Sequence, residues 1–407
     1  MQTLSDNMRY LCDETRMLTG ITVAYGTARQ IESMSYGRAQ EVTLGQDGFR
    51  PCVRALGEDS IFDLASLTKL FTCVSAMRLV EQDFLSLDER VGEIDPRFIH
   101  LGDVTVQDVM CFRACLQTPG RIDEAPSREE GLARLFAVRT APLPAVRLYS
   151  DINAMVIKYV IEKKTGLPFF EALRALILEP CGMRETFAAV PEDCLPRCVC
   201  YNYEHRIERD RLILRTNTPP GTPHDPKALR LSQGGRDLCG HAGLFSTRQD
   251  MVRLAQALLS GRLLRRETLL AIGTDRTGRD NGDGTYRQPL GLLCFTRHPL
   301  QRLSEVPAYA SAHAFGLSGF TGNHLIIDAE QGIFSLFLGN RCHARVSHIT
   351  PPEGKALTDY GLDERGVGRI VWPDGHAAPS SAKYVYFKDA CLHVPIAARM
   401  RALGWLR

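Results

Sequence analysis

The chain has 407 residues, of which 24% are charged and 44% hydrophobic, and its formal net charge is +2. This length suffices for two or three lobes around a substantial core, and the near-neutral charge gives no electrostatic case for binding nucleic acid or an anionic membrane surface. Residues 1–7 lack the basic and apolar regions of a secretory signal, and no uncharged apolar run is long enough for a membrane span. We therefore expect a cytoplasmic protein that acts on a small molecule, without a nucleic-acid or membrane partner. The oligomeric state is not readable from composition.

The 13 cysteines do not indicate a disulfide framework, because most of them stand inside apolar segments and resemble small buried hydrophobic residues. Cys194, Cys198 and Cys200, followed by His205, form the only tight group. Their spacing matches no usual set of zinc ligands. We expect neither a metal nor a cofactor.

The N-terminal part of the chain predicts a helix, two strands and a buried helix. Residues 4–17 have the apolar spacing of an amphipathic helix, and residues 20–26 and 31–36 resemble the strands of a hairpin. Residues 41–57 are too mixed to assign. From Ser66 to about Gln82 the apolar residues cover more than one helix face, which predicts a helix inside the protein.

The middle of the chain is mainly helical, and strands return near its end. Helical patterns occupy residues 104–110, 128–138, 152–164 and 168–179, with Thr105 as an N-cap and Gly166 as a helix stop. Residues 181–240 look irregular. A helix is predicted over 251–259, strands over 291–297, 324–328 and 332–338, and a last helix over 395–406.

This distribution predicts an α+β fold with one antiparallel sheet built from both chain ends and flanked by helices. The expected sheet lobe comprises residues 1–65 and 241–407. The expected mainly helical lobe, inserted between them, comprises residues 66–240.

The pair Ser66 and Lys69 is the first candidate for chemistry. On a helix, residues three apart share a face, so the hydroxyl and the ammonium can touch. A lysine in an apolar site loses its proton more readily and can then activate a serine as a nucleophile. The same spacing recurs at Ser380 and Lys383, but residues 384–387 read as a strand, on which such positions point to opposite faces. We keep only the first pair.

Three motifs in order resemble those of a known superfamily. They are Ser66–Lys69, then Tyr149–Asp151, which opens a helix, and then Leu317–Gly319, before the penultimate strand. Together they resemble the serine beta-lactamase and penicillin-binding-protein superfamily, in particular its class C–like esterase and peptidase branch. Residues 239–247 resemble a helix entry of the same branch. The resemblance implies a beta-lactamase/transpeptidase-like fold.

The resemblance also implies roles for particular residues. Ser66 would be the acylated nucleophile, Lys69 its proton acceptor and Tyr149 a proton shuttle. The backbone N–H groups of Ser66 and Phe320 would form the oxyanion hole. The substrate would be contacted by further residues of the second and third motifs: Asp151, Leu317, Ser318 and Gly319.

Three positions depart from the family pattern. Asp151 replaces an asparagine, which should raise the pKa of Lys69 unless Asp151 is protonated or faces Lys158 instead. Leu317 replaces the cation of the third motif, which favours a neutral ester or amide unless Arg113 or Arg341 has taken over its role. Residues 112–116 differ from the usual sequence on another side of the cleft.

On these grounds we expect a serine hydrolase of the esterase or peptidase type. Two alternatives stay open: a member without turnover that serves as a binding or regulatory protein, and an acyltransferase. His224 and Asp225 belong either to the cleft or to a loop. His241 is expected to brace a helix N-terminus.

Overall fold

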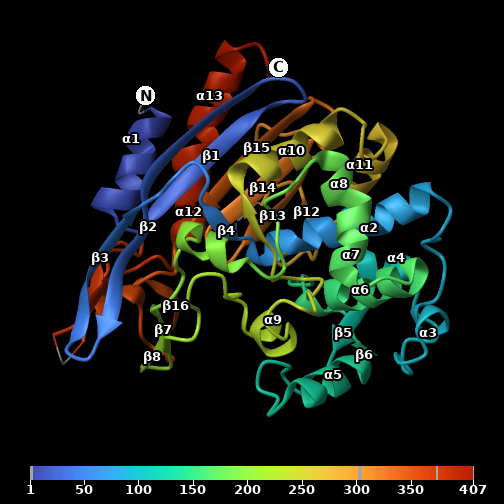
Figure 1. Cartoon of the computed structure of the whole chain (residues 1–407), viewed down its shortest axis with the longest axis horizontal. Coiled ribbons are helices and arrows are strands. Elements are labelled where there is room, and N and C mark those ends of the chain that lie inside the picture. Colours follow the sequence, from blue (N-terminus) through green and yellow to red (C-terminus); the bar gives the residue numbers. More distant parts are fainter. Residues whose placement is uncertain (1–2, 301–304, 373–374, 407) are drawn as a thin grey trace.

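One antiparallel sheet of seven strands organises the protein (Figure 1). The computed structural model describes residues 3–300, 305–372 and 375–406. The strand order is β12-β13-β14-β15-β1-β2-β3. Its strands are β12 (Phe295–Thr296), β13 (Phe315–Gly319), β14 (Asn323–Asp328), β15 (Ile333–Gly339), β1 (Gly20–Thr27), β2 (Ile31–Gly45) and β3 (Gly48–Ala55). The sheet thus joins the two ends of the chain, as expected from the sequence.

The central strands are buried on both faces because helices cover both sides of the sheet. In β1, Ala24 packs into the larger hydrophobic core, whereas its neighbours Val23 and Tyr25 pack into a second core. The partner strand β15 alternates in the same way, with Leu336 in the first core and Phe337 in the second. This alternation follows from the two-residue period of a strand.

Helices form the two outer layers. The larger core lies between the sheet and a group that includes α2, α6 and α10, and the second core lies beneath α1 and α13 (Figure 1). The helices are α1 (Leu4–Arg9), α2 (Thr68–Glu81), α3 (Val91–Ile94), α4 (Val106–Met110), α5 (Arg128–Phe136), α6 (Asp151–Thr165), α7 (Phe169–Leu173), α8 (Glu179–Cys181), α9 (Pro226–Leu231), α10 (Arg248–Leu259), α11 (Arg266–Ile272), α12 (Tyr384–Lys388) and α13 (Val394–Ala402). The mixed content and large antiparallel sheet agree with the α+β prediction.

Several local predictions are confirmed. Thr105 is the N-cap of α4 and forms a capping box with Asp108. Gly166 ends α6 in a left-handed conformation, with φ of 69°. The strands predicted over 324–328 and 332–338 are present as β14 and β15, which pair as a hairpin with His324 opposite Phe337.

Other elements differ from expectation. Residues 41–57, left unassigned, belong largely to β2 and β3, and the predicted strand over 291–297 is reduced to β12. The helix predicted over 4–17 ends in a π-helical segment, Tyr10–Glu14, and the one predicted over 168–179 is interrupted by another, Arg174–Leu178. Residues 384–387, predicted as a strand, lie in α12.

The C-terminal segment packs against the middle of the chain through small sheets. Strand β16 (Val346–Thr350) lies parallel to β7 (Glu204–Glu208), which pairs with β8 (Arg211–Arg215). The remaining pairs are β4 (Ile61–Asp63) with β9 (Phe245–Thr247), β5 (Cys115–Gln117) with β6 (Arg139–Ala141), β10 (Arg279–Asp280) with β11 (Tyr286–Arg287), and β17 (Arg369–Val371) with β18 (Ala377–Pro379). We propose the two lobes stated above as the domain organisation, with β7 and β8 attaching the first to the second.

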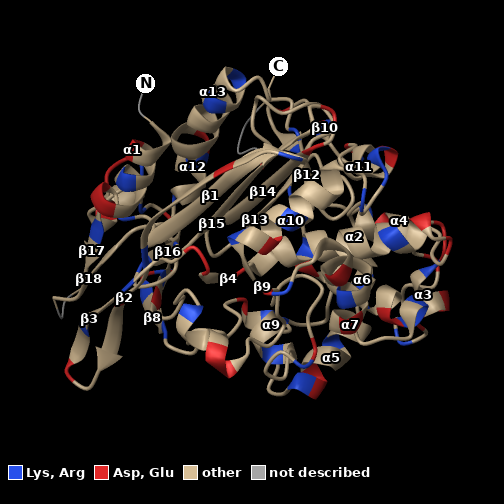
Figure 2. Ribbon diagram, turned by 45° about the horizontal axis from the view of Figure 1, so that its top comes forward, with Lys and Arg blue, Asp and Glu red and all other residues tan. Residues whose placement is uncertain are grey.

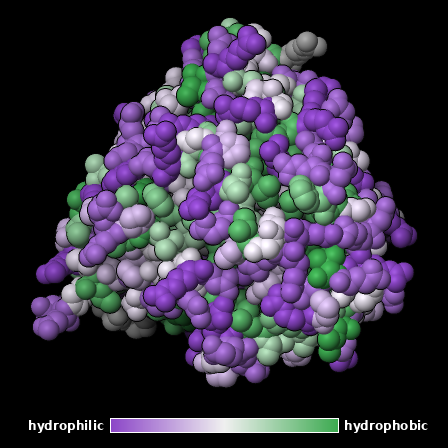
Figure 3. All heavy atoms as spheres, turned by 45° about the vertical axis from the view of Figure 1, so that its right-hand side comes forward, coloured by the Kyte–Doolittle hydropathy of each residue, from purple (hydrophilic) through white to green (hydrophobic). Residues whose placement is uncertain are grey.

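The surface is polar and of mixed charge. Basic and acidic residues are interspersed along the ribbon (Figure 2), and hydrophilic residues cover most of the face in Figure 3, with hydrophobic ones scattered among them. No helix in the described ranges is both long enough and apolar enough to cross a membrane.

Candidate active site

The turn that carries Ser66 is fixed by a buried carboxylate. Asp63, at the end of β4, accepts hydrogen bonds from the backbone N–H of Ala65 at 2.8 Å and of His224 at 2.6 Å. The Asp63 carbonyl accepts a further bond, at 2.7 Å, from the side chain of Asn323 at the start of β14. Ala65 has a φ of 47°, in the left-handed region that non-glycine residues seldom adopt. The turn is thereby anchored to the sheet immediately before α2.

Lys69 lies one turn after Ser66 and is fully buried. Its Nζ lies 2.9 Å from Ser66 Oγ, 2.7 Å from Asp151 Oδ1 and 3.3 Å from the carbonyl oxygen of His241. Burial alone would lower the pKa of Lys69, but the adjacent Asp151 carboxylate outweighs this effect, and the pKa is raised. Lys69 therefore holds its proton and donates to Ser66.

Asp151 faces Lys69 and not Lys158. Its second oxygen lies 3.0 Å from Lys227 Nζ, so the carboxylate bridges two ammonium groups. Burial raises the pKa of Asp151, but the charge of Lys69, with that of Lys227, holds it well below its usual value. Lys158 instead pairs with Asp237.

Tyr149 lies next to this charged pair. Its ring stacks on Phe295, with the centroids 4.6 Å apart, and Lys69 Nζ lies 5.0 Å from the ring centroid. Burial raises the pKa of Tyr149 against the opposing charge of Lys69, so the phenol stays neutral. Its buried hydroxyl has no hydrogen-bond partner with good geometry among the residues described. Gln288 positions the backbone, because its Oε1 accepts from the N–H of Tyr149 at 3.0 Å.

A second polar group lies beside the nucleophile. Asp225 caps α9 by accepting bonds from Lys227 N and Ala228 N, and its Oδ1 lies 2.8 Å from His241 Nε2. Burial raises the pKa of Asp225, but His241 and Lys227 hold it well below its usual value. His241 thus supports the Lys69 pocket through its carbonyl and contacts the helix cap through its ring.

The third motif lies on β13. The Ser318 hydroxyl bonds to Glu305, and lies 2.8 Å from His324 Nδ1 and 3.4 Å from Lys388 Nζ. Lys388, from α12, is buried and pairs with Glu305 at 2.9 Å. Leu317 is buried in the hydrophobic core, and so it is not placed for the predicted substrate contact.

Gly319 allows β13 to approach the nucleophile turn. A Cβ at this position would lie 2.7 Å from the carbonyl oxygen of Leu64, which is closer than packed atoms come. The absence of a side chain therefore sets the distance between β13 and Ser66.

These elements enclose a cleft of about 660 Å³. Of the residues predicted from sequence, Ser66, Tyr149, Asp151, Ser318, Gly319 and Phe320 line it. Lys69 lies behind Ser66. His224 and Asp225, which the sequence left undecided, also line the cleft.

Sequence reasoning missed several residues of the site. Lys227 is separated from the three motifs in the chain, and Lys388 follows the last of them by about 70 residues. Arg206 and Arg341 line the cleft as well. Only Arg341 had a signal in the sequence, as a candidate replacement for the missing cation.

Among the described residues, two groups of side chains have ligand atoms within 4.8 Å of one another: Glu204, His224 and Cys342, and Asp151, Asp225 and His241. Both contain internal ion pairs, and basic side chains contact both: Arg215 lies 2.9 Å from Glu204, and Lys227 3.0 Å from Asp151. A metal ion would have to displace these cations. In the cysteine group, the Cys198 thiol makes a weak hydrogen bond, at 3.9 Å, to the Cys194 carbonyl.

Comparison with known proteins identifies the family. The family model described as Beta-lactamase matches residues 33–358. The chain belongs to the beta-lactamase family. A Salmonella typhi relative, described as "Putative D-alanyl-D-alanine carboxypeptidase", is 27% identical over 319 residues, which cover 71% of each chain.

Several solved structures share the fold. A class C beta lactamase from Rhodobacter sphaeroides superposes with a TM-score of 0.61 at 17% identity, covering 84% of this chain and 94% of that one. The hydrolase EstCE1, described as having promiscuous acyltransferase activity, also gives a TM-score of 0.61 at 17% identity, covering 83% and 92%. The chain therefore has the beta-lactamase/transpeptidase-like fold.

Proposed function

We propose that this chain is a serine hydrolase that forms an acyl-enzyme on Ser66 with a small ester or amide substrate. The main support is the 2.9 Å contact between Lys69 Nζ and Ser66 Oγ at the edge of an open cleft. The carboxypeptidase description of the Salmonella relative and the hydrolase description of EstCE1 support the same class of reaction.

In the proposed reaction, Ser66 Oγ attacks the substrate carbonyl while its proton passes to the neutral form of Lys69, and the bond from that carbon to the leaving oxygen or nitrogen breaks. The leaving group takes up a proton through Tyr149. Water then cleaves the new ester bond, which releases the acid and returns a proton to Ser66. The backbone N–H groups of Ser66 and Phe320 are the proposed oxyanion donors, each typically worth about 3–4 kcal/mol of barrier.

The ion pair between Lys69 and Asp151 determines when Lys69 can act as the base in this reaction. Lys69 can accept the Ser66 proton only after losing its own, and the raised pKa of Lys69 makes that form scarce at neutral pH. The proposed enzyme therefore works through a minor protonation state. The same pair favours a second candidate function, a binding or regulatory protein with little turnover.

Covalent labelling separates these candidates. We expect a fluorophosphonate probe to add one phosphonyl group to the wild-type protein in intact-mass measurements, and to leave Ser66→Ala unlabelled. The matched control is Ser380→Ala, at a buried serine of the second Ser-x-x-Lys sequence, which should label like wild type. Labelling of Ser66→Ala would disprove the assignment. Mass analysis with a panel of esters and a penicillin then identifies substrates that acylate, and addition of alcohols or amines tests acyl transfer.

A further inference from the structure

Lys227 shares the Asp151 carboxylate with Lys69. The two carboxylate oxygens are divided between the two ammonium groups: Oδ1 lies 2.7 Å from Lys69 Nζ, and Oδ2 lies 3.0 Å from Lys227 Nζ. Lys69 is fully buried, whereas Lys227 lines the cleft and has 22% of its side chain exposed. One carboxylate thus connects the proposed base to a residue of the cleft wall.

The helix that carries Lys227 is anchored at both ends. Asp225 caps α9 and accepts a hydrogen bond from the backbone N–H of Lys227 at 2.9 Å. At the other end, Arg128 of α5 donates from its Nε to the carbonyl of Leu231 at 2.9 Å. The Lys227 ammonium group lies 3.9 Å from Asp225 Oδ2, so the Asp151 carboxylate is its closer partner.

The other acidic groups near Lys227 have partners of their own. Asp225 Oδ1 lies 2.8 Å from His241 Nε2, and Asp123 pairs with Arg121 at 2.6 Å. Burial lowers the pKa of Lys227, but the neighbouring carboxylates outweigh this effect, that of Asp225 most strongly, and the pKa is raised. Lys227 therefore keeps its positive charge at neutral pH.

The proposed reaction passes through a neutral Lys69, and Lys227 affects this state most. Besides Asp151, Lys69 faces the phenol ring of Tyr149 and the carbonyl of His241, and neither is a cation. Without a second ammonium group, loss of the Lys69 proton would leave the Asp151 side chain, which is only 24% exposed, as an unpaired carboxylate. Such an uncompensated charge is strongly unfavourable. Lys227 supplies the missing counterion on the other oxygen.

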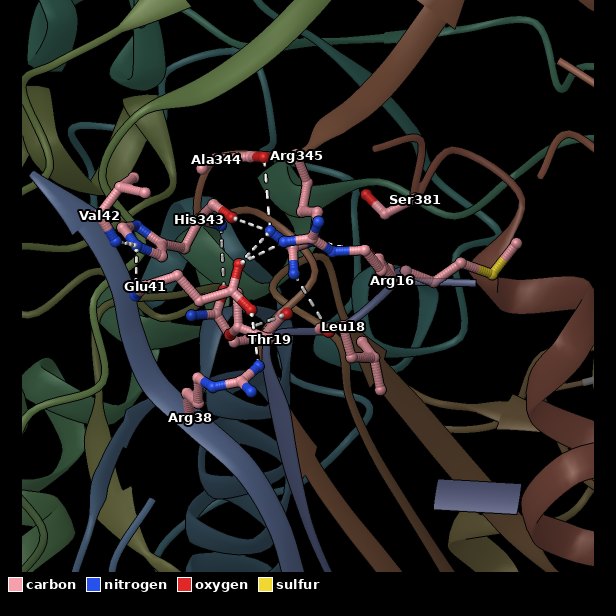
Figure 4. A network of polar contacts seen from close by, with 12 residues as sticks. Arg16, Leu18, Thr19, Arg38, Glu41, Val42, His343, Ala344, Arg345 and Ser381 are labelled. Carbon is pink, nitrogen blue, oxygen red and sulfur yellow. Dashed lines mark hydrogen bonds and ion pairs between the residues drawn. The ribbon is translucent and has the colours of Figure 1, made fainter. Parts of the chain in front are cut away.

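A second carboxylate is shared among cations elsewhere in the protein (Figure 4). Glu41 lies 2.8 Å from Arg345, 3.4 Å from Arg38 and 3.7 Å from Arg16. None of these four residues lines the cleft. This network connects the loop after β15 to β2 and contains no group of the proposed reaction, so it provides a matched control.

We propose that Lys227 is a positioning residue for acylation: it holds one oxygen of Asp151 and keeps this carboxylate paired when Lys69 becomes neutral and accepts the Ser66 proton. This inference rests on the proposed function and adds the control of its base by a residue of α9. The effect of Lys227 on Ser66 is transmitted through Asp151 and Lys69.

The pH dependence of fluorophosphonate labelling tests this role. In Lys227→Met, the neutral form of Lys69 loses its support, and we expect the alkaline rise in labelling rate to move to higher pH by about one unit, the low end of the effect of a nearby charge. At a fixed pH on this rise, the loss in rate is about tenfold. Lys227→Arg keeps the charge and should label within about threefold of wild type.

Two control variants remove a cation that does not contact Asp151. Arg230→Met changes an exposed residue of the same helix, and Arg38→Met removes one cation from the Glu41 network. Both should label like wild type. Lys227→Gln is a second neutral variant, which keeps the test available if Lys227→Met does not fold.

A double-mutant cycle distinguishes this role from damage to α9. An Asp151→Asn protein has no carboxylate to share, so adding Lys227→Met should change its labelling rate less than about twofold. A tenfold loss in both backgrounds would overturn the proposal, and so would a wild-type rate in both neutral Lys227 variants.

A measurement without catalysis separates this inference from the proposed function. In the Ser66→Ala protein with ¹⁵N-labelled lysine, the ammonium signal of Lys69 is identified by its absence after Lys69→Met. Its protons should exchange with water about tenfold more slowly once Lys227→Met is added, because exchange proceeds through the neutral amine. Equally fast exchange would overturn the role of Lys227. Failure of the wild-type protein to react with the fluorophosphonate would contradict only the proposed function.

Discussion

At the scale of single residues, one substitution relative to the family pattern changes the electrostatics of the site. The sequence placed Asp151 near Lys69 and predicted a raised lysine pKa, and the structure agrees in both position and direction. The sequence could not predict the contact between Lys227 and Asp151, because Lys227 belongs to α9 and leaves no signature in the motif that it contacts. Together these charges determine how readily Lys69 loses its own proton and can accept the proton of Ser66.

Asp151→Asn should shift the pH dependence of acylation. Without the carboxylate, burial dominates and the pKa of Lys69 falls, so the alkaline rise in reaction rate moves to lower pH. Each unit of this fall increases the neutral fraction of Lys69 about tenfold at neutral pH. The rate of fluorophosphonate labelling between pH 6 and 10 measures the effect. An unchanged pH profile would show that Lys69 is not the group that titrates.

Tyr149→Phe should lower kcat by about 10² to 10⁴, the range typical of a lost general acid or base. The stacking on Phe295 is retained by phenylalanine, so the loss reports on the hydroxyl alone. Steady-state kinetics on an ester found by the labelling screen measures it. A kcat equal to that of wild type would assign the proton transfer to Lys69.

At the scale of elements, the periodicity of apolar residues predicted helices and strands correctly where an element buries one face or is buried all round. It predicted α2, β1 and the strands β14 and β15. It failed for β2 and β3, whose side chains are largely exposed or half-buried and do not alternate clearly. It also failed for α12, where four aromatic or β-branched residues favour a strand but tertiary packing imposes a helix.

The approach of β13 to the nucleophile turn depends on Gly319. Gly319→Ala should lower kcat/KM about 100-fold, because the added Cβ would displace one backbone segment from the other by a distance to which catalysis is sensitive. Gly102→Ala is a matched control, since its Cβ would meet no atom within 4 Å. Both variants should keep the wild-type circular dichroism spectrum. Full activity of Gly319→Ala would show that the turn can relax.

At the scale of the whole molecule, the cleft draws on segments from most of the chain. The sequence motifs identified the side of the cleft that holds Ser66 and Tyr149, but basic residues of its wall also come from β7, the loop after β15 and α12. Parallel pairing of β7 with β16 brings residues about 140 positions apart together, as with Val346 and His205. Such long-range pairing leaves no local pattern in a sequence.

The cleft also contains a buried group that links stability to pH. Burial lowers the pKa of His224, but Cys342 and the Glu204 carboxylate outweigh it and raise the pKa to about 10. The folded state then keeps a proton that the unfolded state loses above its pKa of about 6.5, so stability falls as pH rises between these values. Between pH 7 and 8.5 we expect a loss of up to about 1.4 kcal/mol per pH unit.

Urea unfolding of wild type and His224→Gln across this range measures the loss. The slope should be absent from the variant. Equal slopes in the two proteins would show that another group titrates.

The pairing of β1 with β15 has a consequence for biosynthesis. About three hundred residues separate Thr27 from its partner Ile333, and Lys388 of the cleft wall is later still. At a translation rate of about 5–20 residues per second, the first strand waits roughly 15–60 s on the ribosome before its neighbour exists. During that time the edge of β1 that later pairs with β15 is exposed and can pair with other chains, and the nascent protein has no complete cleft. Activity can therefore appear only at the end of synthesis, and the first hairpin is the segment that most needs a chaperone.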